Sequence, residues 1–374
     1  MSEWKEVELG KIANVKGGKR LPIGSDLTDI PTAHPYIRTR DINGNQITIS
    51  ELLFVPNDVF PSISNYIVEA GDVIISIVGT IGACAIIPEE LHLASLTENC
   101  AKIVDIDATS LDRQFLFYYL ISADGQAEII SRNVGSTQPK LPLYNIKSTP
   151  IPLPPLPEQR AIAAVLAALD DKIDLLHRQN RTLESLAQAL FRHWFSDGAG
   201  EDWEEGTLGD LVEFHYGKGL KSAIRTGEGF PVVGSSGVVD YHSEFLVEAP
   251  GIVIGRKGTL GEVIYLSDNF FPIDTTYFVK SKNDSPGLYF EYFLLKSIDF
   301  KEMNTDSAVP GLNRTIALGT EVALPPQAEI ARFNELAHPL LQKTITNKSQ
   351  IRTLAALRDS LLPKLMSGEV RVRV

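Results

Sequence analysis

The clearest pattern along the chain is a run of apolar positions whose spacing alternates between four and three residues. The run begins at residue 162 and continues unbroken to residue 194. This heptad repeat predicts a long helix with one narrow apolar seam, as in a coiled coil. We expect the helix to span Glu158 to Phe195, about 57 Å at 1.5 Å per residue. Its seam positions are Ile162, Leu166, Leu169, Ile173, Leu176, Asn180, Leu183, Ala187, Leu190 and Trp194.

One position of this seam is polar. Asn180 stands at an a position among leucines and isoleucines. A buried amide is tolerated only opposite a polar partner, so a single asparagine typically fixes the register of a coiled coil at some expense in stability. We therefore expect Asn180→Leu to raise the thermal stability of the coil while permitting other registers.

A second and less regular heptad pattern runs from Glu329 to Ser367. Pro339 predicts a kink in this helix, and Pro363 predicts its end or a bend. The seam positions are Phe333, Ala337, Leu340, Ile351, Leu354, Leu361 and Leu365, and Thr344, Asn347 and Arg358 interrupt them.

The segments outside the heptads have shorter patterns. Val73–Val78 is a continuous apolar run between glycines, and Ala83–Ile87 is a second one, so both predict buried strands. Asp112–Ile121 predicts a short aromatic helix. The proline-rich stretch Ile151–Pro157 cannot be a helix or a central strand and predicts an extended, stiff boundary.

These patterns occur twice in the same order. Matches at the start of the chain recur at an offset of 199 (203 − 4), and later ones at 179 (258 − 79), 175 (290 − 115) and 171 (325 − 154). The shrinking offset indicates one duplicated unit with deletions in the second copy. The matching segments include Trp4 with Trp203, Gly79–Gly82 with Gly258–Gly261, Phe115–Ser122 with Phe290–Ser297, and Arg181–Leu183 with Arg352–Leu354.

The duplication defines the expected architecture. We predict an α+β fold with two mixed α/β domains in a pseudo-two-fold repeat, separated by a long antiparallel two-helix coiled coil. The domains would be 1–153 and 201–324, and the helical spacers 154–200 and 325–374. Two alternatives remain open: the duplication only enlarges a core, or each long helix is buried separately against its own domain.

Charge and composition narrow the functional classes. The net charge is −12, with −6 in residues 1–153, −10 in 197–324 and +4 in 325–374. A nucleic-acid footprint would therefore be a local basic surface within acidic domains, which favours discrimination over non-specific affinity. The beginning of the chain has no signal-peptide pattern, no segment is apolar enough to span a membrane, and two cysteines make no disulfide framework. We expect a cytoplasmic protein.

Motifs for catalysis are absent. The sequence has no phosphate-binding loop with the required lysine spacing, no His-Glu-x-x-His motif and no nucleophile elbow. Its seven histidines form no metal-ligand pattern, so we predict no metal site. The chain is therefore expected to carry out no chemistry of its own.

Cationic residues in turns and glycine-rich loops are the remaining candidates. Glycine lets backbone N–H groups approach phosphates, and arginine can read guanine through two hydrogen bonds. Arg38 and Arg40 would alternate on a strand and so point to one face. For any single loop, a solvated surface loop is an equally good explanation. The DNA-contact candidates are Lys16, Lys19, Arg20, Arg38, Arg40, Lys140, Lys218, Lys221, Arg256, Lys257, Thr259 and Arg314.

Several of these segments resemble the specificity subunit of type I restriction-modification systems. The stretch Pro154–Arg160 with its following heptads is similar to the central conserved region of that family, and Leu354–Gly368 is similar to its C-terminal motif. Gly234–Gly237 and Gly255–Gly261 resemble motifs of its target-recognition domains. The resemblance covers essentially the whole chain.

The resemblance implies two target-recognition domains that each read one half of a split double-stranded DNA target. It also implies two antiparallel conserved helices that set the gap and dock methyltransferase subunits, two in number, with restriction subunits joining through the complex. S-adenosylmethionine, ATP and Mg²⁺ would belong to those partners, and this chain would bind no cofactor. Two other functions remain open: a coiled-coil protein–protein adaptor without DNA binding, and a nuclease or methyltransferase in its own right.

Overall fold

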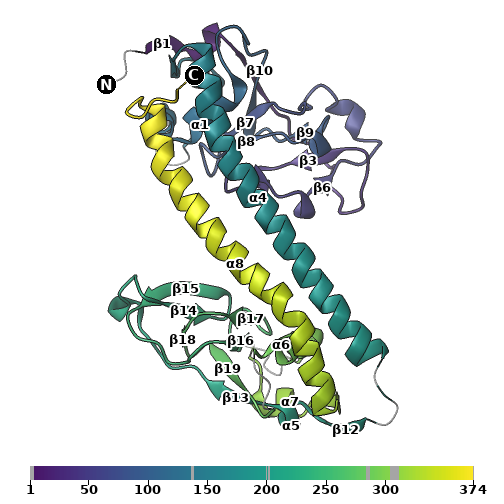
Figure 1. Ribbon diagram of the computed structural model, residues 1–374. Helices are drawn as coiled ribbons and strands as arrows, with labels where there is room; N and C mark the ends of the chain where they lie inside the picture. The colour runs from purple at the N-terminus through teal and green to yellow at the C-terminus, as the bar shows by residue number, and fades with distance from the viewer. Residues whose placement is uncertain are drawn as a thin grey trace. The chain divides into compact units, whose positions relative to one another are not determined.

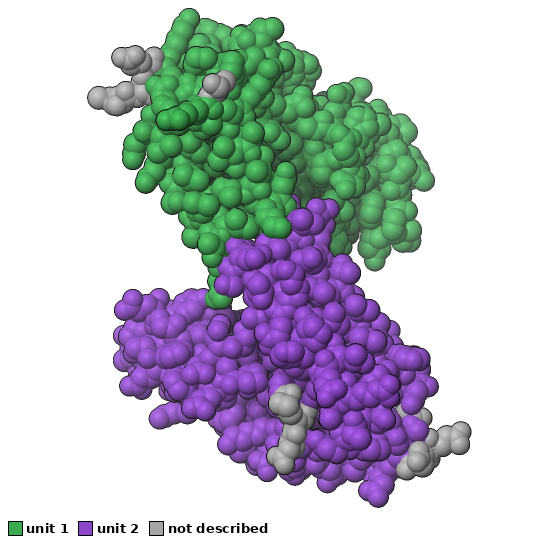
Figure 2. Space-filling model, in the orientation of Figure 1, with its two compact units in different colours: residues 1–173, 352–374 green, residues 174–351 purple. Residues whose placement is uncertain are grey.

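The computed structural model describes residues 4–135, 139–198, 200, 203–283, 287–303 and 311–373. The chain forms two compact units (Figure 2). Unit 1 comprises residues 1–173 and 352–374, and unit 2 comprises residues 174–351. Each unit therefore contains one copy of the repeat together with parts of both long helices.

Unit 1 contains a four-stranded sheet in the order β2-β10-β7-β8, a three-stranded sheet in the order β6-β3-β9, and two two-stranded ribbons, β1-β11 and β4-β5. Three short helices complete it. The strands are β1 Lys5–Glu8, β2 Asn14–Gly17, β3 Pro35–Ile37, β4 Ile42–Asn43, β5 Gln46–Ile47, β6 Leu53–Phe54, β7 Val73–Ser76, β8 Cys84–Ile86, β9 Ser95–Leu96, β10 Cys100–Val104 and β11 Pro150–Leu153; the helices are α1 Arg113–Ile121, α2 Ala123–Ser131 and α3 Leu143–Lys147.

Unit 2 repeats this topology. Its four-stranded sheet has the order β13-β19-β16-β17, its three-stranded sheet the order β15-β14-β18, and its ribbon pairs β12 with β20. The strands are β12 Glu204–Thr207, β13 Val212–Tyr216, β14 Phe230–Gly234, β15 Gly237–His242, β16 Gly251–Gly255, β17 Val263–Leu266, β18 Phe271–Pro272, β19 Thr276–Ser281 and β20 Glu321–Leu324; the helices are α5 Leu208–Leu211, α6 Tyr289–Ser297 and α7 Arg314–Leu318.

The sequence offsets place most of these elements. β1 with β12 and β2 with β13 are related by 199, while α3 with α7 and β11 with β20 are related by 171. The predicted strands Val73–Val78 and Ala83–Ile87 are β7 and β8, and the predicted aromatic helix is α1, whose N-cap Asp112 accepts a hydrogen bond from the Phe115 N–H. The duplication is therefore a duplication of the fold. Within the described residues 298–303 and 311–313, no helix of unit 2 corresponds to α2.

Two long helices contribute to both units. Helix α4 spans Leu156–Arg192 and continues as a π-helical turn, His193–Asp197, while α8 spans Gln327–Met366 (Figure 1). The proline-rich boundary is extended through β11, which pairs with β1 in a two-stranded ribbon, but the expectation that it cannot be helical is wrong at Leu156 and Pro157, which begin α4. Helix α8 does not end at Pro363, since it runs through Pro339 and Pro363 as one helix; a kink at Pro339 and a bend at Pro363 stay predictions. The seam residue Ala337 before Pro339 and Leu341 after it are both buried, which holds the flanking turns.

The helices pair antiparallel in each unit. In unit 1, Arg358 Nη1 donates to Asp170 Oδ1 at 2.7 Å, and Arg371 Nη1 donates to Glu158 Oε1 at 2.9 Å. Residue numbers thus rise along one helix while they fall along the other. In unit 2, Asn347 Nδ2 donates to Asn180 Oδ1 at 2.8 Å. The partner that we expected for the Asn180 amide is therefore confirmed and is Asn347.

The predicted seam is buried or half-buried at every position. It also closes the domain cores, because Ile162 and Leu166 pack with Phe115 of α1 as well as with Leu365 of α8. The long helices therefore pair with each other and are also buried against the domain, so the two arrangements occur together. Thr344 and Asn347 do not interrupt the seam as we expected, since both are buried in it.

Candidate nucleic-acid interface

An arginine–tyrosine cluster lies at one end of the four-stranded sheet of unit 2. It consists of Tyr216, Arg256, Tyr277 and Arg314. The Arg256 guanidinium carbon lies 5.0 Å from the Tyr216 ring centroid and 5.7 Å from that of Tyr277, and the Arg314 guanidinium carbon lies 5.3 Å from the Tyr216 centroid. Two of the predicted DNA-contact residues, Arg256 and Arg314, are thus brought onto one aromatic ring, an arrangement that stabilises both cations.

Strand pairing explains why these residues meet. Tyr216 is the last residue of β13 and is opposite Tyr277 of β19, while Gly255, the last residue of β16, is opposite Thr276. Arg256 therefore leaves the sheet beside both rings. Arg314 begins α7, whose N-cap Asn313 accepts hydrogen bonds from the Thr315 and Ile316 N–H groups.

The backbone around Arg256 is held from both sides. Its N–H donates to Thr275 O at 2.9 Å, and its carbonyl accepts from the Leu312 N–H at 3.0 Å. The side chain is also fixed, because Nη1 donates to Asp274 O at 2.9 Å. Burial and the neighbouring Tyr216 hydroxyl raise the pKa of Tyr277, while Arg256 acts in the opposite direction. The Tyr277 ring is therefore neutral at neutral pH.

The other candidates of unit 2 surround this cluster on exposed loops. Lys257 and Thr259 lie on the loop between β16 and β17, and Lys218 and Lys221 follow β13. Within the described ranges, no carboxylate lies at ion-pair distance from any of the five candidate cations of unit 2, which are Lys218, Lys221, Arg256, Lys257 and Arg314. These charges remain available to an anion from outside the chain.

The glycines of the paired basic motifs have a different role from the one we expected. A Cβ on Gly18 or Gly217 would lie 2.1 Å from a backbone carbonyl oxygen, that of Thr97 or Ile273. Their N–H groups donate within the fold, to Cys100 O and Thr276 O. Glycine is needed at both sites for close packing of the backbone, and these two N–H groups do not face phosphate.

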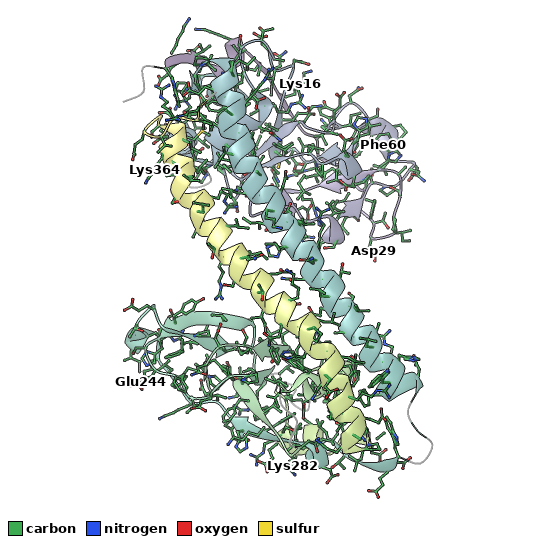
Figure 3. The ribbon with its side chains drawn as sticks, viewed as in Figure 1. Lys16, Asp29, Phe60, Glu244, Lys282 and Lys364 are labelled. Carbon is green, nitrogen blue, oxygen red and sulfur yellow. The ribbon has the colours of Figure 1, made fainter. Side chains whose placement is uncertain are left out.

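The candidates of unit 1 at the corresponding edge are mostly engaged by carboxylates. Lys16, labelled in Figure 3, forms an exposed ion pair with Asp105 at 3.3 Å. Arg20 Nε lies 2.5 Å from Glu98 Oε1, whereas the Lys19 ammonium lies 5.8 Å from the Tyr66 ring centroid. Hydrogen bonds from Asn14 and Lys16 lower the pKa of Asp105. These carboxylates are therefore ionised at neutral pH and offset the basic charge.

The prediction that Arg38 and Arg40 project from one strand is wrong. Strand β3 ends at Ile37, and residues Thr39–Asp41 form a 3-10 turn. Arg38 bonds the buried Asp41 carboxylate through Nε at 2.9 Å and Nη2 at 2.7 Å, and its side chain is 15% exposed. Asp41 selects the turn because its carboxylate also accepts the Arg38 N–H.

The remaining candidate of unit 1 is Lys140, which lies beside the residues that follow β7, because the neighbouring Leu141 N–H donates to Ile77 O at 3.0 Å. It is exposed and bridges Val78 and Val134 through its backbone.

The arginine–tyrosine cluster of unit 2 also contains two residues that were not among the predicted site residues, Tyr216 and Tyr277. The sequence feature that could have indicated Tyr216 is its position directly before the Gly217-Lys218 pair.

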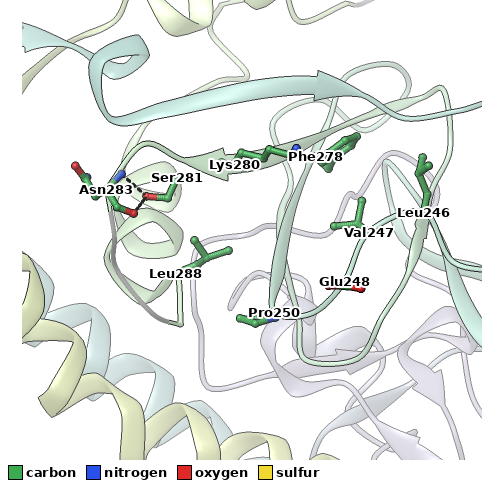
Figure 4. A pocket seen from close by; sticks show the side chains of 10 residues that line it. Leu246, Val247, Glu248, Pro250, Phe278, Lys280, Ser281, Asn283 and Leu288 are labelled. Carbon is green, nitrogen blue, oxygen red and sulfur yellow. Dashed lines mark hydrogen bonds between the residues drawn. The ribbon is translucent and has the colours of Figure 1, made fainter.

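The predicted DNA-contact residues do not line either of two cavities in unit 2. One of about 800 Å³ lies between the segment 246–250 and the far end of β19, where Phe278 and Lys280 line it (Figure 4). A second, of about 670 Å³, is lined by Tyr289 and His338, whose side chains are 3.0 Å apart. Neither is lined by a predicted DNA-contact residue.

The structure also bears on metal binding. Among the residues with described positions, no three His, Cys, Asp or Glu side chains are grouped as a metal site would require. None of the helices in those ranges combines the length and the apolar character needed to cross a membrane.

Comparison with known proteins identifies the family. The model of the type I restriction modification DNA specificity domain matches residues 1–185 and 200–350, so the chain belongs to this family. The type I restriction enzyme MjaIX specificity subunit of Methanocaldococcus jannaschii is 28% identical over 299 residues, covering 68% of each chain. The type I restriction enzyme HindI specificity subunit of Haemophilus influenzae is 22% identical over 476 aligned positions, covering 99% of this chain and 100% of that one.

A solved structure has the same fold. The S subunit of a type I restriction-modification system from M. genitalium superposes with a TM-score of 0.66 at 21% identity, covering 97% of this chain and 96% of that chain. The duplicated α+β fold with two long helices is thus shared with an S subunit.

Proposed function

We propose that this member of the type I restriction-modification DNA specificity family selects the DNA sequence on which a type I restriction-modification complex acts. Residues 1–153 and 201–324 would be two target-recognition domains, each reading one half of a bipartite duplex target. Residues 154–200 and 325–374 would be the helical spacers. The observation that carries the proposal is that the family match extends over both copies of a duplicated fold.

The proposal assigns the chemistry to partners. Two methyltransferase subunits would dock on the helices, bind S-adenosylmethionine and methylate adenine, and restriction subunits would use ATP and Mg²⁺. This chain would be non-catalytic and would act in the cytoplasm, where its DNA target lies. A bipartite target suits two related readers, since each fold copy can meet one half-site.

The direct test uses the complex of this chain with its methyltransferase. Methylome sequencing of cells with and without this chain should reveal one split motif that depends on it. Duplexes with that motif should bind more tightly than random duplexes throughout a salt series, because sequence readout persists when phosphate contacts weaken. Equal affinity for all duplexes at every salt concentration would favour a protein–protein adaptor instead. Cleavage or methylation of plasmid DNA by the lone chain would favour an enzyme.

We also propose that the paired helices set the gap between the half-sites. Matched seven-residue insertions keep the seam in phase and lengthen each helix by about 10.5 Å. Because DNA rises about 3.4 Å per base pair, the unread gap should grow by about three base pairs while both half-sites stay unchanged. A rotation of the half-sites by roughly a third of a turn would reduce affinity.

The helix contacts decide where these insertions go. Asn180 pairs with Asn347, so an insertion after Asn180 is matched by one after Thr346. An insertion after Ile351, a seam position of α8, would instead separate the two amides. An active variant with an altered half-site and the original gap would contradict this part of the proposal.

A further inference from the structure

The arginine–tyrosine cluster can be compared with the equivalent positions of the first copy. β2 and β13 are related by an offset of 199, so Gly17 corresponds to Tyr216. Gly17 is opposite Ala101 just as Tyr216 is opposite Tyr277. The offset of 179 between β7 and β16 makes Ile77 the counterpart of Arg256, and α3 and α7 start at Leu143 and Arg314.

The backbone contacts support this correspondence. The Leu141 N–H donates to Ile77 O at 3.0 Å, as the Leu312 N–H donates to Arg256 O at 3.0 Å. A Cβ on Gly17 would lie 3.6 Å from Leu143 Cδ1, which is where the second copy places a tyrosine ring beside Arg314. The same fold therefore forms with glycine, alanine, isoleucine and leucine in place of the whole cluster.

It follows that folding does not require the cluster. Two guanidinium groups share one ring, and no carboxylate of the described residues is at ion-pair distance from either. The shared ring stabilises the two cations, and an anionic or acceptor-rich ligand would supply the counter-charge that the described residues do not. The cluster is therefore directed at a ligand.

The two arginines differ in how firmly they are held. Arg314 is exposed, whereas Arg256 is half-buried between two rings, with its backbone and Nη1 both hydrogen bonded. A guanidinium carries five N–H groups in a rigid fork, more than these contacts use, and such a fork matches the O6 and N7 acceptors of guanine. A phosphate contact needs no comparable fixation, because an exposed, flexible side chain can follow the backbone.

We propose that Arg256 is a specificity-determining residue that reads a guanine in the half-site bound by the second copy, with Tyr216 as the residue that positions its guanidinium. This inference rests on the proposed DNA-binding function. Arg314 contacts a neighbouring phosphate, and the first copy reads its half-site without an equivalent of this contact.

The test uses the complex of the full chain with its methyltransferase and the split motif found by methylome sequencing. In Arg256→Ile, the second copy receives the residue of the first, so the fold tolerates it. Affinity for the specific duplex should fall roughly 10- to 100-fold, with affinity for random duplex unchanged. Replacing one guanine of the second half-site by 7-deazaguanine, which lacks the N7 acceptor, should weaken the wild type but not Arg256→Ile.

Variants of Tyr216 test whether its ring positions the Arg256 guanidinium, and a lysine variant outside the cluster controls for loss of positive charge. Tyr216→Phe keeps the ring and should keep discrimination at that base, whereas Tyr216→Leu should relax the methylated motif at the same position only. Lys280→Ala, an exposed lysine on β19 outside the cluster, should leave both affinities unchanged. Circular dichroism melts of all variants check that they fold.

Two outcomes would overturn the inference while leaving the proposed function intact. Equal losses on specific and random duplexes would make Arg256 a phosphate contact, and an unchanged motif in Arg256→Ile would remove it from base readout. If the wild-type complex itself shows no sequence-dependent binding, the proposed function fails first.

Discussion

The two copies of the repeat share the strand order and register of the four-stranded sheet, yet they differ where this sheet meets the loops after β7 and β16. The first copy has Gly17 and Ile77 there, and the second has Tyr216 and Arg256. The first copy forms the same four-stranded sheet without these side chains, which supports a role for them toward a ligand.

The cations outside the cluster support the same distinction. In the first copy, Arg20 pairs with Glu98 and Arg38 with Asp41. Burial would raise the pKa of Glu98, but the hydrogen bond from Arg20 lowers it below its ordinary value. A count of basic residues therefore does not locate a DNA surface, because a cation with an ionised partner carries little field outward.

The helices also contribute differently to the two cores. In unit 2, α4 and α8 add rings, with Phe191, Phe195 and Phe333 packed at centroid distances of 5.1 to 5.7 Å. In unit 1, the same helices add Ile162, Leu166 and Leu365. Phe333 is the counterpart of Ile162 at the offset of 171.

The largest predicted effect tests this aromatic packing. Phe333 is 1% exposed, so Phe333→Ala should lower the free energy of unfolding of unit 2 by about 3–5 kcal/mol. Trp194, whose ring centroid is 6.3 Å from that of Phe333, allows unfolding in urea to be followed by fluorescence. Leu336→Ala, at a 48% exposed position of α8, is the control and should change stability by about 0.5 kcal/mol at most. Equal losses in the two variants would contradict the proposed packing difference.

The second prediction separates a structural arginine from a ligand-directed one. Arg38→Ala leaves the 2% exposed Asp41 carboxylate without its cation, which should destabilise unit 1 by about 3 kcal/mol. Hydrogen exchange of β3 and β7 amides reports this loss. Arg40→Ala, at an exposed position of the same turn, should leave exchange unchanged. If Arg38→Ala changed the methylation motif without faster exchange, Arg38 would be a DNA contact instead.

The third prediction replaces our expectation for Asn180. The Asn347 side chain is 0% exposed and donates to both Gln179 and Asn180, so Asn180→Leu should lower stability by about 1–3 kcal/mol rather than raise it. The double variant Asn180→Leu/Asn347→Leu should recover much of the loss, because two apolar partners replace two amides. Additive losses, measured by urea unfolding, would show that the amides are not coupled.

The sequence alone predicts much of this fold. The offsets relate equivalent elements because matching segments recur in the same order, and the heptad steps identify α4 and its seam because they depend on local periodicity. Thr344 and Asn347 were misread as interruptions because the environment of a polar seam residue depends on the helix opposite. One helix read by itself cannot show that Asn347 faces Asn180.

The candidate site was predicted less completely. Arg256 and Arg314 were found as cations in turns, but their common ring, Tyr216, depends on strand pairing and on the start of α7. Arg38 was misplaced because alternation was extended past Ile37, where Asp41 closes a turn. The tyrosines do not stand out in the sequence, because most positions differ between the two copies and only strand pairing brings Tyr216 opposite Tyr277.

The smallest predicted effect concerns a carboxylate that joins α4 to the rest of unit 2. Glu184 Oε1 accepts from Lys296 Nζ at 2.6 Å and from the Tyr292 hydroxyl at 3.0 Å. Asp170 has a similar role in unit 1, where it accepts from Tyr118 and Arg358. Burial would raise the pKa of Glu184, but the hydrogen bond and charge of Lys296 lower it below its ordinary value of 4.5.

A lowered folded-state pKa means that the ionised carboxylate stabilises unit 2 above the unfolded pKa, and that this contribution is lost as the pH falls through the folded pKa. Glu184→Gln should therefore cost less than about 1 kcal/mol at pH 7, because the side chain is 38% exposed and solvent screens the pair. The difference from wild type should shrink as the pH falls below about 4.5. Glu335→Gln, an exposed carboxylate on α8, is the control and should show no such dependence. A Glu184→Gln deficit that stays constant or grows on acidification would mean that the carboxylate acts through packing rather than through its charge.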